Sequence, residues 1–159
     1  MKSLNIIAAC SENRVIGRAG KLPWKITEDW NYFLNQTKGG TIIFGRKAFE
    51  EFGHSFPDRE TIVLTRNQEW KSKDITVATS LQEGLDTAQK LEGEIWISGG
   101  QHVYEQAMPM ADKLYLTLIH AEVEGDAFFP AWDSFFPKKI SQYKNSNNNF
   151  SYTFFVFEK

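Results

Sequence analysis

Three apolar runs of this sequence each end in residues that could bind phosphate. The residues that follow the runs are glycines, hydroxyls and cations: Gly45-Arg46-Lys47 after residues 41–44, Thr65-Arg66 after 61–64, and Ser98-Gly99-Gly100 after 95–97. Short β-branched runs are typical of buried strands, and an open α/β sheet binds its ligands beyond the carboxyl ends of the strands. Phosphate is bound by free backbone N–H groups, by small residues that allow close approach and by fixed positive charge. The three strand ends together therefore predict a nucleotide cofactor with several phosphates.

The residues at these strand ends favour NADP over NAD. An NAD enzyme places an acidic residue where the 61–65 run ends, to bind the ribose hydroxyl, whereas this chain has the cation Arg66, which suits a 2′-phosphate. No GxGxxG motif is present, which excludes a standard dinucleotide-binding half. Gly99 and Gly100 indicate backbone that side chains must not crowd. Solvated arginines and a simple tight turn before the next helix remain alternative interpretations.

A carboxylate on the apolar face of a predicted helix is the second chemical feature. Helical spacing places Asp29 on the apolar stripe, while Glu28 is expected to face outward with Asn31 and Tyr32. Burying an unpaired, ionised carboxylate costs on the order of several kcal/mol, so we expect burial to raise the pKa of Asp29. A ligand with a flat pair of N–H donors would bind such a group through two hydrogen bonds. The alternative is that Thr27 caps the helix and both acids merely suit its N-terminal end.

Alternating strands and helices must position these residues. Strands are expected at residues 4–10, 41–45, 61–65, 75–79, 95–98, 114–121, 139–143 and 150–158, and helices at 27–36, 46–52, 81–91 and 101–108. This order predicts a single α/β domain over residues 1–159, with a mostly parallel, twisted eight-stranded sheet flanked by four helices. Residues 145–149 join the last two strands without a helix, so the C-terminal strand is expected to be antiparallel. Ser80 and Glu83 form a predicted capping box.

The segment 13–25 is a long connection with two glycines and a proline. Its apolar residues, among them Ile16, Leu22 and Trp24, need something to cover. We therefore expect a lid over the site rather than an ordinary surface loop.

Composition excludes several classes of protein. Cys10 is the only cysteine, which excludes a disulfide framework, and the three histidines lie too far apart to suggest a metal site. The net charge of −2 argues against binding to nucleic acid or to a membrane surface. No stretch could span a bilayer, and the apolar run near the N-terminus is too short for a secretory signal, so we expect a cytoplasmic protein.

Taken in order, the motifs of the chain resemble one known family. They are Val15-Ile16-Gly17, Leu22-Pro23-Trp24, Asp29 with Phe33, Gly45-Arg46-Lys47, Pro57-x-Arg59, Leu64-Thr65-Arg66, Ser98-Gly99-Gly100 with Val103-Tyr104, and Glu124-Gly125-Asp126 with Phe129-Pro130. Over essentially the whole chain, their order and spacing closely resemble dihydrofolate reductase of the bacterial chromosomal type. The resemblance implies NADPH-dependent reduction of 7,8-dihydrofolate to 5,6,7,8-tetrahydrofolate in folate metabolism, by hydride transfer to C6 and protonation at N5. It also implies a monomer that binds antifolate inhibitors.

The resemblance further implies roles for individual residues. Catalytic roles fall to Leu22, Trp24, Asp29, Tyr104 and Thr117. Substrate would be bound by Ile7, Ala8, Asp29, Trp30, Phe33, Phe52, His54, Arg59 and Thr117. NADPH would be bound by Ala9, Ile16, Gly17, Gly20, Lys21, Gly45, Arg46, Lys47, Ala48, Leu64, Thr65, Arg66, Thr79, Ser98, Gly99, Gly100, Gln101, His102, Val103, Tyr104 and Gln106. Asp29 would hold the pterin N3 and 2-amino group, and Arg59 the glutamate α-carboxylate.

Two features of the backbone are implied in the same way. The Gly99–Gly100 peptide bond is expected to be cis. Asp126 is expected to accept N–H bonds from the lid near Gly17 and Ala19.

Some residues depart from the family pattern, and rival functions stay open. The departures, which alter pocket shape and cofactor contacts, are Trp30, Ala48, Phe56 and Ser98. One rival is the related reductase of riboflavin biosynthesis, which shares the architecture and the cofactor. The other is a non-catalytic module that binds NADPH. Following NADPH absorbance after adding dihydrofolate separates the three.

Overall fold

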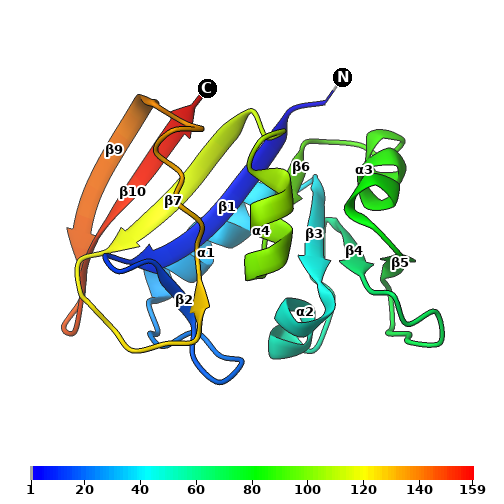
Figure 1. The fold of residues 1–159 in the computed structure, drawn as a ribbon, viewed down its shortest axis with the longest axis horizontal. Coiled ribbons are helices and arrows are strands. Elements are labelled where there is room, and N and C mark those ends of the chain that lie inside the picture. Colours follow the sequence, from blue (N-terminus) through cyan, green and yellow to red (C-terminus); the bar gives the residue numbers. More distant parts are fainter. Residues whose placement is uncertain (1) are drawn as a thin grey trace.

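The computed structural model describes residues 2–159, which fold around an eight-stranded sheet (Figure 1). Its strands are β1 (Leu4–Ser11), β3 (Thr41–Gly45), β4 (Glu60–Leu64), β5 (Thr76–Ala78), β6 (Ile95–Ile97), β7 (Lys113–Ile119), β9 (Lys138–Ser146) and β10 (Ser151–Glu158). They lie in the order β5-β4-β3-β6-β1-β7-β10-β9. Neighbouring strands from β5 to β7 are parallel, whereas β10 is antiparallel to both β7 and β9. The predicted, mostly parallel sheet with an antiparallel C-terminal strand is confirmed.

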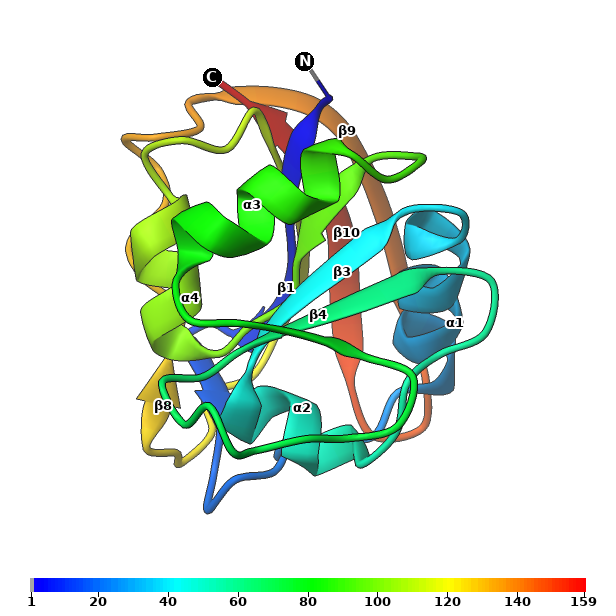
Figure 2. The ribbon, with the colours of Figure 1, turned by 90° about the vertical axis from the view of Figure 1, so that its right-hand side faces the viewer.

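Across residues 2–159, four helices flank the sheet, as predicted. They are α1 (Thr27–Thr37), α2 (Arg46–Phe52), α3 (Leu81–Gln89) and α4 (Gln101–Ala107). Helices α3 and α4 lie on one face and α1 on the other, while α2 directly follows β3 (Figure 2). Alternate side chains of β3 reach both layers: Ile43 packs in the core with residues of α3 and α4, and Ile42 and Phe44 pack with residues of α1 and α2. Covering both faces explains why this strand is apolar at consecutive positions.

The start of α3 is only partly as the capping box predicts. Ser80 Oγ accepts the Glu83 N–H at 3.1 Å, which caps the helix as expected. The Glu83 carboxylate instead accepts hydrogen bonds from the N–H and the hydroxyl of Thr79, at 3.0 and 2.6 Å. The reciprocal bond is therefore shifted by one residue toward the N-terminus.

Glu28 is only half-buried rather than fully exposed on the outer side of α1, because its carboxylate meets the C-terminal hairpin. Its Oε1 accepts hydrogen bonds from the Tyr152 hydroxyl at 2.8 Å and from Asn145 Nδ2 at 2.6 Å. Tyr32, on the same side of α1, packs against Phe154 with ring centroids 4.5 Å apart. The C-terminal hairpin of β9 and β10 folds beside this side of α1, and the periodicity of one helix cannot reveal such a neighbour.

The expected lid is partly a strand. Within the segment 13–25, β2 (Val15–Gly17) pairs antiparallel with β8 (Ala127–Phe128), forming a small second sheet. Sequence analysis did not predict this ribbon. It joins the segment after β1 to the segment after β7.

A tight turn follows β2. Arg18 N–H donates to the Lys21 carbonyl at 2.8 Å, and Lys21 N–H donates to the Arg18 carbonyl at 3.1 Å. Between them, Ala19 and Gly20 have φ of 50° and 80°, the two positive values of a type I′ hairpin turn. We call residues 15–22 the lid hairpin.

The two edges of the sheet differ. β9 is nine residues long, all of its residues are exposed, and three of them are lysines: Lys138, Lys139 and Lys144. At the opposite edge, β5 has only three residues. In the described part of the chain, no helix is long and apolar enough to cross a membrane.

Candidate active site

A cleft of about 890 Å³ opens toward the carboxyl ends of the central strands β1, β3 and β6. Helices α1, α2 and α4 and the lid hairpin complete its walls. Most of the predicted site residues line it: Ile7, Ala8, Ala9, Ile16, Gly17, Gly20, Leu22, Asp29, Trp30, Phe33, Gly45, Arg46, Lys47, Ala48, Phe52, Ser98, Gly99, Gly100, Gln101, His102, Val103 and Tyr104. Two of the three strand ends that predicted a nucleotide, at residues 45–47 and 98–100, thus meet here.

Asp29 lies in the first turn of α1 and lines the cleft, in agreement with its place on the apolar stripe. Its Oδ1 accepts a hydrogen bond from the hydroxyl of Thr117, a buried residue of β7, at 2.7 Å. Among residues 2–159, no cation forms an ion pair with this carboxylate. Burial raises the pKa of Asp29 to about 6, while the Thr117 bond acts to lower it and the charge of Glu28 to raise it. The raised pKa agrees with the prediction, and the site offers a desolvated carboxylate to a ligand with paired N–H donors.

An aromatic slot adjoins this carboxylate. Trp30 of α1 stacks on Phe33 one turn further along the helix and on Phe52 at the end of α2, with ring centroids 5.6 and 5.4 Å apart. Phe56 closes the cluster edge-on to Phe33 and Phe52. Trp30 remains 37% exposed, so its ring stays accessible from the cleft. Flat apolar walls of this kind suit a planar aromatic ligand.

Arg59 and His54 lie outside the cleft lining, beyond this slot. Arg59 Nη1 donates to the Leu34 carbonyl at 2.7 Å and to the Thr37 hydroxyl at 2.8 Å, and its Nε donates to the Pro57 carbonyl at 2.8 Å. These bonds fix the guanidinium at the C-terminal end of α1. The exposed His54 ring packs on the ring of Phe56, with centroids 5.3 Å apart.

A glycine cradle forms the opposite end of the cleft. Gly45 N–H donates to the Gly99 carbonyl at 2.7 Å, which ties the end of β3 to the end of β6. The Gly99–Gly100 peptide bond is cis, as the resemblance implied. A Cβ on Gly45 would lie 3.2 Å from Val103 Cγ2, and Gly99 has φ of 116°. A side chain at Gly45 would press on Val103, and one at Gly99 would be strained at this φ, so both positions favour glycine and keep the two strand ends close together.

Two polar groups beside the cradle are buried. The Tyr104 hydroxyl donates to the Ile7 carbonyl at 2.8 Å, and burial raises the pKa of Tyr104. The Oγ of Ser98 is buried without a hydrogen-bond partner among residues 2–159, although Ser98 lines the cleft. This departure from the family pattern leaves a buried, unpaired hydroxyl behind the cleft wall.

The third strand end lies to the side of the cleft rather than in its lining. Leu64 is the last residue of β4 and pairs in register with Gly45 of the cradle, and Thr65 and Arg66 follow it. Thr79 follows β5, and its hydroxyl donates to Glu83. These residues are therefore placed one and two strands away from the cradle, as a dinucleotide extending along the strand ends would require.

The remaining predicted residues take other positions. Trp24 is buried, and its Nε1 has no partner among residues 2–159. Lys21 ends the lid turn, Gln106 lies on α4, and Thr117 lies behind Asp29. None of them lines the cleft.

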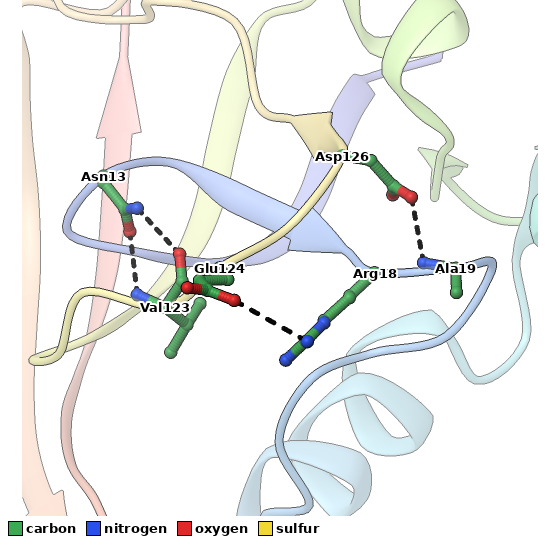
Figure 3. A network of polar contacts seen from close by, with 6 residues as sticks. All are labelled: Asn13, Arg18, Ala19, Val123, Glu124 and Asp126. Carbon is green, nitrogen blue, oxygen red and sulfur yellow. Dashed lines mark hydrogen bonds and ion pairs between the residues drawn. The ribbon is translucent and has the colours of Figure 1, made fainter.

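Six lining residues were absent from the predicted site: Tyr32, Phe44, Glu50, Glu51, Asp126 and Ala127. Phe44 ends an apolar run and was interpreted as core. Glu50 and Glu51 follow the cations of α2, where acids are usually solvated. For Asp126 a lid contact was expected, and its Oδ2 accepts the Ala19 N–H at 3.0 Å (Figure 3). Its own N–H donates to the Gly17 carbonyl at 3.0 Å, so the direction of the bond at Gly17 is the reverse of the expected one.

The cleft fits a dinucleotide. The glycine cradle leaves room for a pyrophosphate, and Arg46 and Lys47 supply positive charge at the start of α2. Arg46 Nε lies 3.3 Å from Glu50 Oε1, so part of its charge is compensated within the helix. No group of three His, Cys, Asp or Glu side chains in residues 2–159 is arranged to hold a metal ion.

Comparisons with known proteins agree with this geometry. A family model described as dihydrofolate reductase matches residues 3–159. The dihydrofolate reductase of Staphylococcus haemolyticus is 37% identical over 159 residues, which cover 98% of this chain and 95% of that protein. The Bacillus subtilis (strain 168) dihydrofolate reductase is 38% identical, with 98% and 94% covered. Among solved structures, dihydrofolate reductase from Enterococcus faecalis complexed with NADP(H) and RAB-propyl matches with a TM-score of 0.92 at 35% identity, covering 98% of this chain and 95% of that one.

Proposed function

The chain belongs to the dihydrofolate reductase family, and on that premise we propose which of its residues carry out the reaction. The reaction reduces 7,8-dihydrofolate to 5,6,7,8-tetrahydrofolate with NADPH. The observation that carries the assignment of residues is Asp29: a carboxylate without a cation, placed in the cleft between an aromatic slot and a glycine cradle.

Asp29 binds and orients the substrate. The pterin presents N3 and its 2-amino group as adjacent, coplanar donors, which match the two oxygens of one carboxylate. The Thr117 hydroxyl bonds Oδ1 at 2.7 Å and fixes the orientation of the carboxylate. A negative charge held in a desolvated site also stabilises positive charge on the pterin, which favours protonation at N5 by water and makes C6 the better hydride acceptor.

The aromatic slot and Arg59 hold the rest of the substrate. Trp30, Phe33 and Phe52 provide flat apolar surfaces for the aminobenzoyl ring. Arg59 uses Nε and Nη1 for bonds to the protein, which leaves the donors of Nη2 for the α-carboxylate of the glutamate tail.

The cofactor would lie along the strand ends. The backbone of Gly99 and Gly100, with Arg46 and Lys47, would hold the pyrophosphate, and Arg66 would hold the 2′-phosphate. When bound, NADPH supplies the hydride for C6. The lid hairpin, through Leu22, keeps water from the reacting ring faces.

The test is the variant Asp29→Asn, assayed by the loss of NADPH absorbance after dihydrofolate is added. We expect turnover to fall about 100-fold at pH 7, and the deficit to shrink as pH falls and substrate arrives already protonated. Asp133→Asn, the same change at an exposed residue far along the chain, should leave turnover unchanged. Full activity of Asp29→Asn at pH 7 would contradict the assigned role. Quenching of tryptophan fluorescence by NADPH without loss of absorbance would favour a non-catalytic module that binds the cofactor.

We also infer a single-domain monomer that works in the cytoplasm and binds antifolates in the pterin slot. The single domain is supported by the place of β1 in the middle of the eight-stranded sheet, and the other inferences rest on membership of the family. Sedimentation of the purified protein with and without NADPH measures the oligomeric state directly.

A further inference from the structure

The lid hairpin is tied on one side to the segment that follows β7. Asp126 Oδ2 accepts the Ala19 N–H, and Arg18 Nη2 lies 3.6 Å from Glu124 Oε2 (Figure 3). The backbone N–H of Asp126 also donates to the Gly17 carbonyl. These contacts fix the base and the turn of the hairpin. They all lie on the β8 side of the cleft.

A single hydrogen bond ties the lid hairpin to the opposite wall. Leu22 N–H donates to Glu51 Oε1 at 2.7 Å. Leu22 and Glu51 both line the cleft, the first from the lid hairpin and the second from α2. Among residues 2–159, no other hydrogen bond or ion pair joins residues 18–22 to α2. This bond therefore spans the mouth of the cleft between the lid and the helix that carries Arg46 and Lys47.

The bond between Leu22 and Glu51, which we call the latch, does not depend on the other contacts of the lid hairpin. The turn at residues 18–21 is closed by its own two hydrogen bonds, so its internal geometry does not depend on Glu51. Pro23 follows Leu22 and has no N–H, which makes the Leu22 N–H the last donor of the hairpin. Glu51 is exposed as a whole residue, but partial burial of its carboxylate raises the pKa, and the Leu22 N–H acts to lower it. The N–H thus stabilises the ionised form of this carboxylate.

We propose that Glu51 is a positioning residue that latches Leu22 to α2 and so holds the lid closed over bound NADP(H). The proposal rests on the proposed function, because it assigns the space beneath the latch to the cofactor. Opening the latch is then required before the cofactor leaves. Charge-assisted hydrogen bonds of this length are among the stronger ones in proteins, so removing the acceptor should change the release rate measurably.

The test compares Glu51→Ala, Glu51→Gln and the control Glu92→Ala. Glu51→Gln keeps an acceptor at Oε1, whereas Glu51→Ala removes it. Glu92 is an exposed acid between α3 and β6, outside the cleft lining. Amide hydrogen exchange at Leu22 in the NADPH-bound protein measures directly how often the Leu22–Glu51 bond opens, because the Leu22 N–H is its donor. Stopped-flow displacement of NADPH gives the release rate, and steady-state assays with dihydrofolate give kcat and KM.

We expect Glu51→Ala to speed Leu22 exchange and NADPH release about threefold to tenfold, with the KM for NADPH rising more than kcat changes. Glu51→Gln should restore most of the wild-type behaviour, and Glu92→Ala should match wild type. Release from Glu51→Ala within experimental error of Glu92→Ala would overturn the latch, and so would equal effects of Ala and Gln. Thermal unfolding identifies a variant that fails to fold, in which case Leu22 exchange in wild type still decides, because exchange as fast as that of an unbonded amide would overturn the latch. If wild-type protein turns over no dihydrofolate, the proposed function fails, whereas slow Leu22 exchange would still support the contact itself.

Discussion

Asp29 is expected to cost the folded protein stability at neutral and alkaline pH. Its carboxyl has an ordinary pKa of 3.8 and a folded-state pKa raised to about 6, chiefly by burial. At about 1.36 kcal/mol per pH unit, the ionised form is disfavoured in the folded state by about 3 kcal/mol, which partial exposure reduces to about 2–3 kcal/mol. Asn at this position keeps an Oδ1 that can accept the Thr117 hydroxyl. We therefore expect Asp29→Asn to be more stable than wild type by about 2 kcal/mol at pH 8.

The sign of the pH dependence follows from the raised value. Between pH 3.8 and about 6, the folded protein binds a proton at Asp29 that the unfolded chain has already released. The cost is therefore fully present above about pH 6, falls as the pH drops and disappears below 3.8. Urea unfolding at pH 8, 6 and 4.5 measures the difference between Asp29→Asn and wild type, with Asp133→Asn as the matched change at an exposed residue. A difference that is zero at pH 8, or the same at every pH, would refute the reasoning.

Three further predictions follow from the same contacts. A Cβ on Gly125 would lie 2.3 Å from Val15 Cγ1 and 2.6 Å from the Gly17 carbonyl oxygen. Gly125→Val should therefore displace β2, lower turnover at least about tenfold and lower the free energy of unfolding by about 1–3 kcal/mol. Unchanged turnover would contradict this prediction. Arg66→Ala should raise the KM for NADPH about tenfold and leave that for NADH unchanged, and parallel shifts would mean that Arg66 does not bind the 2′-phosphate. Tyr104→Phe leaves the buried Ile7 carbonyl without its hydrogen-bond donor. The free energy of unfolding, measured by urea denaturation, should fall by about 1–3 kcal/mol. A loss well below about 0.5 kcal/mol would contradict this prediction.

Much of the sheet could be predicted because strong local signals agree with it. β3 is apolar at consecutive positions, as strands covered on both faces are, and Ser80 marks the start of α3. Asp29 was found because its carboxylate interrupts an apolar stripe, a conflict that helical spacing exposes. The identity of the ligands, by contrast, depended on the resemblance of ordered motifs to one family.

The rest depends on contacts between distant segments. The ribbon of β2 and β8 pairs Val15 with Phe128, and each strand is too short to leave a periodic signal. Glu28 appears outward-facing until the hairpin brings Tyr152 beside it. Glu51 was missed because an acid on a short, charged helix is usually solvated, and only its bond to Leu22 distinguishes it.

The unequal edges of the sheet bear on how the protein behaves when it is concentrated. A strand edge presents unpaired backbone donors and acceptors that can recruit another chain into a shared sheet. Along β9, closely placed lysines make such pairing between identical chains electrostatically unfavourable, despite the exposed Ile140 and Tyr143. At β5, shortness gives the same protection by offering too few backbone groups. Replacing the β9 lysines with threonine would remove the charge barrier, and aggregation at high protein concentration would be the consequence.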